Sequence, residues 1–386
     1  MKKSTIFGAF FGALFVVVVI MLITGRMNRN EDRYKDIMAN ATTESPSTEA
    51  PTTEEITTEE VTTEEETTEE PTTEEPYNDT TAPIFTYCNS YPVINVGEKF
   101  DIHKFVGYID DYDSNPKLKV KGEIDTSTEG TYPVKVFIKD HTGNKLKQQM
   151  NVTVKKRSSS KKSTSTPSYN WYKFKKFKKN YKNKNTILGI DVSRWQNDID
   201  FNKVAAAGCK FAIIRIGGYD DGEPYEDRYY AANIRNAKAA GLKVGIYWAG
   251  EESTIDEVKS NVSYMMELLK GEELDFPIAY DWEDFTNMED YHVSIREFNE
   301  CFYAFANEVE KYGYEAMLYG SKNYLESVWR PNGYPVWVAQ YADSTDYSGD
   351  YIMWQKGSTG HLSGIETYVD LDVLYKDKYT FTKYPK

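Results

Sequence analysis

The last two hundred residues alternate between short apolar runs and helical patterns, and this alternation constrains the fold more than any other feature of the 386-residue chain. Eight runs rich in β-branched and aromatic residues predict strands, at 187–192, 211–216, 243–248, 277–282, 315–319, 336–341, 351–355 and 368–373. Helical patterns between the first six predict helices, at 201–207, 227–240, 255–270, 294–312 and 322–328. Strands that alternate with helices form parallel sheets. Eight of them predict a closed α/β barrel, residues 187–386, whose last turns have lost their helices.

The fourth of these runs ends in two acids. In FPIAYDWED, residues 276–284, Asp281 and Glu283 are two positions apart. Side chains alternate between the faces of a strand, so both acids face one way while Tyr280 and Trp282 face the other. A neutral carboxylic acid beside an ionised carboxylate is the apparatus that glycosidic bond cleavage needs. The same pattern also occurs in solvated strands, so its meaning depends on the rest of the chain.

The N-terminal region, residues 1–40, contains an uninterrupted run of apolar and small residues at about 6–23. The run is long enough to cross a bilayer and longer than the core of most signal peptides. We expect an uncleaved signal anchor, with a cleaved signal peptide as the alternative. The flanking Lys and Arg residues alone favour the opposite orientation. The spacer that follows looks extracellular, so we expect a single-pass protein of the cell membrane with its catalytic domain outside.

Two segments have the composition of linkers. Residues 41–82 are built from TTEE units, and the 14 acidic residues of 41–79 equal the whole formal net charge of -14. Such a segment cannot bury a core, so we expect a disordered, extended tether. Residues 155–186 interleave Lys and Arg with aromatic residues. The basic part, 155–184, suggests contact with an anionic wall polymer or lipid headgroups, with a solvated linker as the alternative and no nucleic acid as partner.

Between these linkers, residues 83–154 predict a small all-β module. Alternating stretches at 117–121, 133–139 and 148–154 are separated by turn signals such as DHTGN at 140–144. The run EGTYPVKVFIKDHTGNK resembles the immunoglobulin-like repeats of bacterial surface proteins. The resemblance implies a small sandwich that serves spacing or adhesion.

Several kinds of site are not predicted. The three cysteines, Cys88, Cys209 and Cys301, have no C-x-x-C spacing, and the four histidines are scattered. We therefore expect no disulfide scaffold, no metal site and no cofactor. The absence of G-x-S-x-G, P-loop and G-x-G-x-x-G motifs argues against the usual serine hydrolases, nucleotide hydrolases and dinucleotide enzymes.

The barrel region resembles the family 25 glycoside hydrolases, which are bacterial and phage-type muramidases. The resemblance rests on motifs in a fixed order: GIDVSRWQNDIDFNKV, GCKFAIIRIG, AAGLKVGIYWAG, AYDWED, VWVAQY, MWQKG and YVDLDVL. It implies a flattened TIM-like barrel. It also implies hydrolysis of the β-1,4 bond between N-acetylmuramic acid and N-acetylglucosamine in peptidoglycan.

The resemblance assigns roles to four carboxylates. Glu283 corresponds to the general acid and Asp281 to its partner, while Asp191 and Asp370 belong to the opening DVS and closing VD motifs. Like-charge repulsion and desolvation should keep one member protonated near neutral pH, and we expect that member to be Glu283. Asp281 would then stay ionised and either stabilise the developing positive charge or orient the 2-acetamido group of the sugar as an internal nucleophile. Both routes remain open.

Aromatic residues near the strand ends are candidates for stacking on sugar rings: Tyr247, Trp337, Tyr341 and Trp354. Core packing is the alternative for each. Gln196 and Arg215 are further candidates for the polar lining of the site.

Two other functions compete with a membrane-tethered muramidase. A non-catalytic adaptor would bind the wall without cutting it, but the complete carboxylate set argues against that reading. A chitinase-like enzyme of the family 18 type would carry an Asp four residues before Glu283, where this chain has Ala279. Trp248-Ala249 and Asp372 also depart from the common family 25 pattern, in which His-Phe and Asn are usual. These departures bear on substrate preference and pH optimum.

Overall fold

The computed structural model describes residues 79–157, 171–220 and 222–386, which all lie within one compact unit, 74–386. The expected membrane anchor, nearly all of the Thr/Glu-rich tether and part of the basic linker lie outside the described residues. Within the described ranges, no helix is both long and apolar enough to span a membrane.

The first folded part is a small all-β module, as predicted. Strands β1 (Ile84–Cys88) and β3 (Val106–Ile109) form an antiparallel pair, and four more strands form a second sheet in the order β2-β6-β5-β4. Their bounds are Val93–Asn95 for β2, Lys117–Lys121 for β4, Gly130–Lys139 for β5 and Lys145–Lys155 for β6, and a short helix, η1 (Ile102–Lys104), precedes β3. The alternate residues Val134, Val136 and Ile138 of β5 are buried in the core, so period-two patterning produced the sheet.

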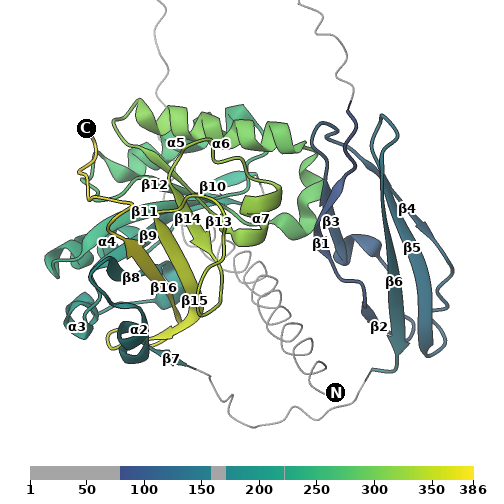
Figure 1. The fold of residues 1–386 in the computed structure, drawn as a ribbon, viewed down its shortest axis with the longest axis horizontal. Helices are drawn as coiled ribbons and strands as arrows, with labels where there is room; N and C mark the ends of the chain where they lie inside the picture. Colours follow the sequence, from purple (N-terminus) through teal and green to yellow (C-terminus); the bar gives the residue numbers. More distant parts are fainter. Residues whose placement is uncertain (1–78, 158–170, 221) are drawn as a thin grey trace, which may run out of the picture. The chain divides into compact units, whose positions relative to one another are not determined.

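The second part is the predicted eight-stranded barrel (Figure 1). The strands are β8 (Thr186–Val192), β9 (Phe211–Asp220), β11 (Lys243–Gly250), β12 (Ile278–Trp282), β13 (Ala316–Ser321), β14 (Val336–Ala339), β15 (Met353–His361) and β16 (Val369–Tyr375). The sheet closes because β8 pairs with both β9 and β16. A short extra strand, β10 (Glu223–Glu226), folds back on the end of β9 as a hairpin.

The direction of the last strand differs from the all-parallel expectation. Strand β16 runs antiparallel to both of its neighbours, β15 and β8, whereas the other adjacent pairs in the barrel are parallel. The connection from β15 to β16, residues 362–368, is shorter than the dozen or so residues that a parallel crossover requires. The chain therefore turns back directly. The beginning of β16 consequently lies at the rim where the other strands end.

Five helices cover the outside of the barrel where they were predicted: α3 (Phe201–Ala207), α4 (Tyr230–Ala239), α5 (Ile255–Leu269), α6 (Ile295–Glu310) and α7 (Lys322–Ser327). Helices α5 and α6 lie side by side in Figure 1 and contact each other. Both begin with a reciprocal capping box, Thr254 with Glu257 and Ser294 with Glu297, which satisfies backbone N–H groups of the first turn.

A further helix, α2 (Phe174–Tyr181), lies in the segment that we expected to be a linker. Phe174 and Phe177 are 2% and 0% exposed within the core of the barrel, and Lys178 donates a hydrogen bond to the carbonyl of Ala207. Just before it, β7 (Tyr172–Lys173) pairs with β15. The spacing of the aromatic residues gives this basic sequence an apolar stripe. The C-terminal half of the basic segment is therefore part of the barrel domain.

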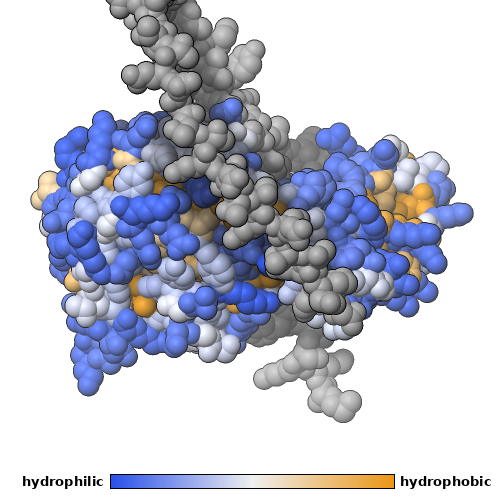
Figure 2. Space-filling view, turned by 90° about the horizontal axis from the view of Figure 1, so that it is seen from above, coloured by the Kyte–Doolittle hydropathy of each residue, from blue (hydrophilic) through white to orange (hydrophobic). Residues whose placement is uncertain are grey.

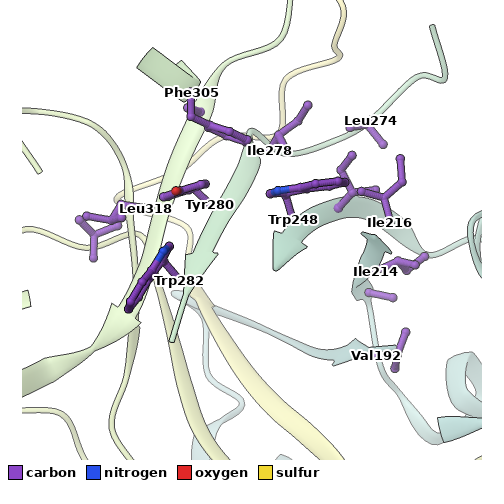
Figure 3. Close-up of a cluster of buried hydrophobic side chains, with 14 of the residues drawn as sticks. Val192, Ile214, Ile216, Trp248, Leu274, Ile278, Tyr280, Trp282, Phe305 and Leu318 are labelled. Carbon is purple, nitrogen blue, oxygen red and sulfur yellow. The ribbon is translucent and has the colours of Figure 1, made fainter. Parts of the chain in front are cut away.

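The barrel has two apolar layers, one on each face of its strands. The outer layer lies under the helices and includes Trp248, Tyr280 and Trp282, which are drawn in Figure 3 with Phe305 of α6 and Leu318 of β13. The inner layer fills the barrel with the side chains Phe211, Ile213, Tyr247, Phe276, Ala279, Met317, Tyr319 and Trp337, among others. On the face shown in Figure 2, hydrophilic residues cover most of the described surface.

The segment that follows β12 packs against the immunoglobulin-like module. Helix η3 (Phe285–Tyr291) begins two residues after Glu283, and the hydroxyl of Thr86 in β1 donates to the carbonyl of Phe285 at 2.7 Å. A Cβ atom at Gly107 in β3 would lie 2.6 Å from the same carbonyl oxygen, so only glycine allows this approach. The module thus supports the backbone next to the predicted general acid.

Candidate active site

Four predicted carboxylates converge at one rim of the barrel. Asp191, near the end of β8, is paired in register with Asp370, the second residue of β16. The antiparallel direction of β16 explains this pairing, because it brings the first residues of that strand to the rim where parallel strands end. Asp281 ends the interior face of β12, and Glu283 follows the strand directly.

The predicted alternation along β12 is confirmed. Tyr280 and Trp282 are fully buried in the outer layer, whereas Ala279 belongs to the inner layer, so Asp281 faces the interior of the barrel. Asp281 lies beside Tyr319 of β13 in the sheet register and is half-buried, while Glu283 is exposed.

A buried glutamate holds the outer face of this strand. Glu252, which is 1% exposed, accepts hydrogen bonds from the hydroxyl of Tyr280 at 3.1 Å and from Nε1 of Trp248 at 2.7 Å. Its backbone carbonyl accepts from Nε1 of Trp282 at 3.1 Å. Burial raises the pKa of Glu252, and these donors oppose the rise. The contacts fix the rotation of β12 and so keep Asp281 aimed inward.

Burial and mutual repulsion raise the proton affinity of the clustered acids. Burial, followed by the charges of Glu283 and Asp191, raises the pKa of Asp281 well above its usual range, while Arg215 opposes this rise. The pKa of Asp370 is raised for the same reasons, by burial and by Asp191 and Glu283. Burial raises the pKa of Asp191 to about 7. The cluster therefore retains protons near neutral pH.

A fifth carboxylate, Asp372, belongs to the same cluster and was not predicted as a site residue. Its side chain is fully buried, accepts a hydrogen bond from Nε1 of Trp337 at 3.0 Å and shares a hydrogen bond with Asp191. Burial, with Asp191 and Asp370, raises its pKa well above the usual range. The sequence did contain a signal, because Asp370 and Asp372 alternate in DLD as Asp281 and Glu283 do in DWE.

Tyr319 and Gln355 connect opposite sides of the site, and neither was predicted. The hydroxyl of Tyr319 donates to Oε1 of Gln355 at 2.9 Å, and Nε2 of Gln355 donates to Oδ2 of Asp191 at 2.9 Å. This chain of hydrogen bonds runs from β13 through β15 to β8. It orients Asp191 and fixes the amide of Gln355, which lies in the MWQKG motif.

Arg215 forms a buried ion pair next to the carboxylate cluster. Its Nε lies 2.8 Å from Oδ2 of Asp227, and both side chains are buried. In the sheet register Arg215 is next to Tyr247, and its charge lowers the pKa of both Tyr247 and Asp281 against the effect of burial. Arg215 is thus the cation that favours the ionised form of Asp281.

The four aromatic candidates have different surroundings. Tyr247 and Trp337 lie in the inner layer, with ring centroids 6.4 Å apart in an edge-to-face arrangement. Tyr341 is 43% exposed and lies within electrostatic range of Asp370 and Glu283. Trp354 instead lies in the outer layer, where its Nε1 donates to the carbonyl of Gln340 and its ring packs near Tyr181. Trp354 thus packs on the outer side of the barrel strands, not in the inner layer that contains Tyr247 and Trp337.

The side-chain amide of Gln196 is buried and hydrogen-bonded to backbone groups of the barrel. Its Oε1 accepts from the backbone N–H of Ser193 at 2.8 Å, and its Nε2 donates to the carbonyl of Tyr368 at 2.8 Å. These bonds tie the short helix η2 (Arg194–Gln196), which follows β8, to the residue before β16. Gln196 therefore holds together the two strands that carry Asp191 and Asp370.

Comparison with known proteins agrees with this geometry. Residues 190–365 match the family described as "Glycosyl hydrolases family 25", and residues 88–154 match "Bacterial surface protein, Ig-like domain". The "Uncharacterized protein YegX" of Escherichia coli (strain K12) is 29% identical over 199 residues, which are 49% of this chain and 70% of that protein. The "Autolytic lysozyme" of Clostridium acetobutylicum is 26% identical over 189 residues, covering 48% and 55%.

Among solved structures, a family 25 glycosyl hydrolase from Bacillus anthracis is similar, with a TM-score of 0.43 and 22% identity over 50% of this chain and 89% of that chain. The matched residues, 190–365, span the barrel from β8 to the connection before β16 and include Asp191, Asp281 and Glu283. The family 25 match thus covers the barrel and the immunoglobulin-like match covers the module before it, and this protein is a glycoside hydrolase of the lysozyme type.

Proposed function

We propose that this protein cleaves the β-1,4 bond between N-acetylmuramic acid and N-acetylglucosamine in peptidoglycan, with Glu283 as the general acid and Asp281 as its partner. The observation that carries the proposal is the difference between the two acids. Glu283 is exposed, where a glycan can reach it, and Asp281 is half-buried inside the barrel rim among further carboxylates.

Glu283 is suited to protonate the leaving oxygen. A sugar bound over the rim would exclude water from this carboxyl group, and the nearby acids would repel its negative charge. Both effects favour the neutral form that can donate a proton. After cleavage the carboxylate can accept a proton from the incoming water, as microscopic reversibility requires.

Asp281 is suited to act as the ionised partner at the transition state. The free site disfavours its charge, but a developing oxocarbenium ion adds positive charge next to it, and Arg215 already favours the ionised form. The same carboxylate could orient the 2-acetamido group of the sugar for internal attack. Protons held by Asp191 and Asp370 would limit the total negative charge during either route.

The cell-membrane location is part of the same proposal. The apolar run at 6–23 and the Thr/Glu-rich tether that follows it support a single-pass protein whose barrel faces outward. Attachment through this N-terminal region would limit cutting to wall near the membrane, which suits local remodelling. Glycan strands are the proposed partner, and the basic residues of 155–184 support added contact with an anionic wall polymer or lipid headgroups.

Product analysis tests the proposed bond specificity. The full chain in detergent is incubated with purified peptidoglycan, and the new reducing ends are identified by mass spectrometry. We expect reducing-end muramic acid. Reducing-end glucosamine would assign the cut to the other glycosidic bond, and tight binding without any product would favour the adaptor function.

A further inference from the structure

Three carboxylates meet at one end of the immunoglobulin-like module, outside the active site. Asp79 precedes β1, and Asp110 and Asp111 follow β3. One carboxylate oxygen of each residue lies within 4.8 Å of one from each of the other two. Asp79 and Asp110 are only 4% and 1% exposed, so their charges are largely removed from water.

The hydrogen bonds of these acids use only half of their oxygens. Oδ1 of Asp110 accepts from two backbone N–H groups of the following turn, and Oδ1 of Asp79 accepts from the backbone and hydroxyl of Thr81. The same hydroxyl also donates to Oδ2 of Asp111. The remaining oxygens, Asp79 Oδ2, Asp110 Oδ2 and Asp111 Oδ1, are buried and have no hydrogen-bond partner. Three buried acceptors on three like charges are costly unless a cation joins them.

We propose that Asp79, Asp110 and Asp111 bind a calcium ion. The donors are all carboxylate oxygens, the ligands that hard cations prefer. Ca²⁺ binds oxygen at about 2.3–2.6 Å, so two of its ligands are at most about 5 Å apart, and one carboxylate oxygen from each of the three residues satisfies this limit. Mg²⁺ requires shorter bonds of about 2.1 Å and a stricter octahedron. Water and backbone carbonyls would complete the larger shell of Ca²⁺.

The position of this site gives the ion a structural role. The carbonyl of Asp110 accepts from the backbone N–H of Ile295 at 2.7 Å, and that of Asp111 accepts from Arg296 at 3.3 Å. Both donors belong to the first turn of α6, the helix that packs behind β12. Asn144, in the turn between β5 and β6, donates to the carbonyl of Asp79 at 3.2 Å. The ion would therefore fasten the end of the tether, the immunoglobulin-like module and the catalytic barrel together.

Calcium titration of the full chain tests the site. The protein, in detergent and stripped with EDTA, is titrated with CaCl₂ in a calorimeter, with MgCl₂ as comparison. We expect one calcium site per chain that Asp110→Asn weakens at least 10-fold, because the net charge of the ligands sets calcium affinity. Asp125→Asn is the matched control, since Asp125 holds a similar turn of the same module through Ser127 but lies outside the cluster.

Melting temperatures separate ion binding from a merely structural role of the acids. Asn at position 110 keeps the Oδ1 acceptor and removes one repelling charge. In EDTA the Asp110→Asn protein should therefore melt at or above the wild type, and in calcium the order should reverse. The proposal is overturned if calcium does not raise the wild-type melting temperature. It is also overturned if Asp110→Asn and Asp79→Asn keep the full calcium response, or if they melt lower to the same extent in both buffers.

Discussion

At the residue scale, the site is a cluster of acids in which most carboxyl groups favour their protonated form. Asp191, Asp281, Asp370 and Asp372 are all held in surroundings that favour the protonated form, whereas Glu283 is exposed to the substrate side. Arg215 is the buried cation that counteracts this effect at Asp281. The arrangement keeps the free site partly neutral, and in the proposed mechanism Asp281 would ionise when positive charge develops on the sugar.

The stability of the protein should depend on Asp191 in a defined pH range. Its pKa is about 7 in the folded chain and about 3.9 when unfolded. The native state thus binds a proton that the unfolded state releases, and this stabilisation is complete below about pH 4 and is lost as the pH rises through about 7. The Asp191→Asn protein has no titrating group at this position and therefore does not lose this stabilisation. The melting temperature of Asp191→Asn relative to that of the wild type should therefore rise from pH 4 to pH 8.

Calorimetric scans at several pH values measure this difference. Asp198→Asn serves as the control because Asp198 is exposed on the loop after η2. A constant difference between Asp191→Asn and wild type across the range would show that Asp191 does not hold a proton in the folded state.

At the element scale, period and turn signals predicted all eight strands and five helices of the barrel, but not the direction of the last strand, β16. The antiparallel course of β16 follows from the length of 362–368, a signal that strand counting ignores. Tyr319 and Gln355 could not be predicted, because their hydrogen bonds cross the interior of the barrel between strands that are not neighbours in the sheet. The same holds for Asp79 and Asp110, which meet only after the immunoglobulin-like module folds.

Helix α2 shows how composition can hide an element. Its many lysines suggested a solvated linker, yet the apolar stripe of Phe174 and Phe177 is buried. Phe177→Ala should lower the free energy of unfolding by about 3–5 kcal/mol, the usual cost of removing a buried phenylalanine. Lys175→Ala, on the exposed side of the same helix, should have little effect. Denaturant unfolding of both variants measures this difference in the free energy of unfolding. Equal stabilities would show that the segment does not pack in the core of the barrel.

At the scale of the whole molecule, the catalytic strand is supported from two sides. Glu252 fixes the outer face of β12, and the immunoglobulin-like module packs on η3, directly after Glu283. The contacts of the module therefore reach the backbone of the active site. The proposed calcium ion would act at the same junction between the module and the barrel.

The central claim is that Glu283 is the general acid, and the rate of peptidoglycan hydrolysis by Glu283→Gln tests it most directly. We expect turnover to fall by about 10² to 10⁴-fold, with an unchanged melting temperature and retained binding to insoluble peptidoglycan. Glu267→Gln, on the exposed face of α5, should keep the wild-type rate. Wild-type turnover by Glu283→Gln would contradict the account and remove Glu283 from the catalytic role.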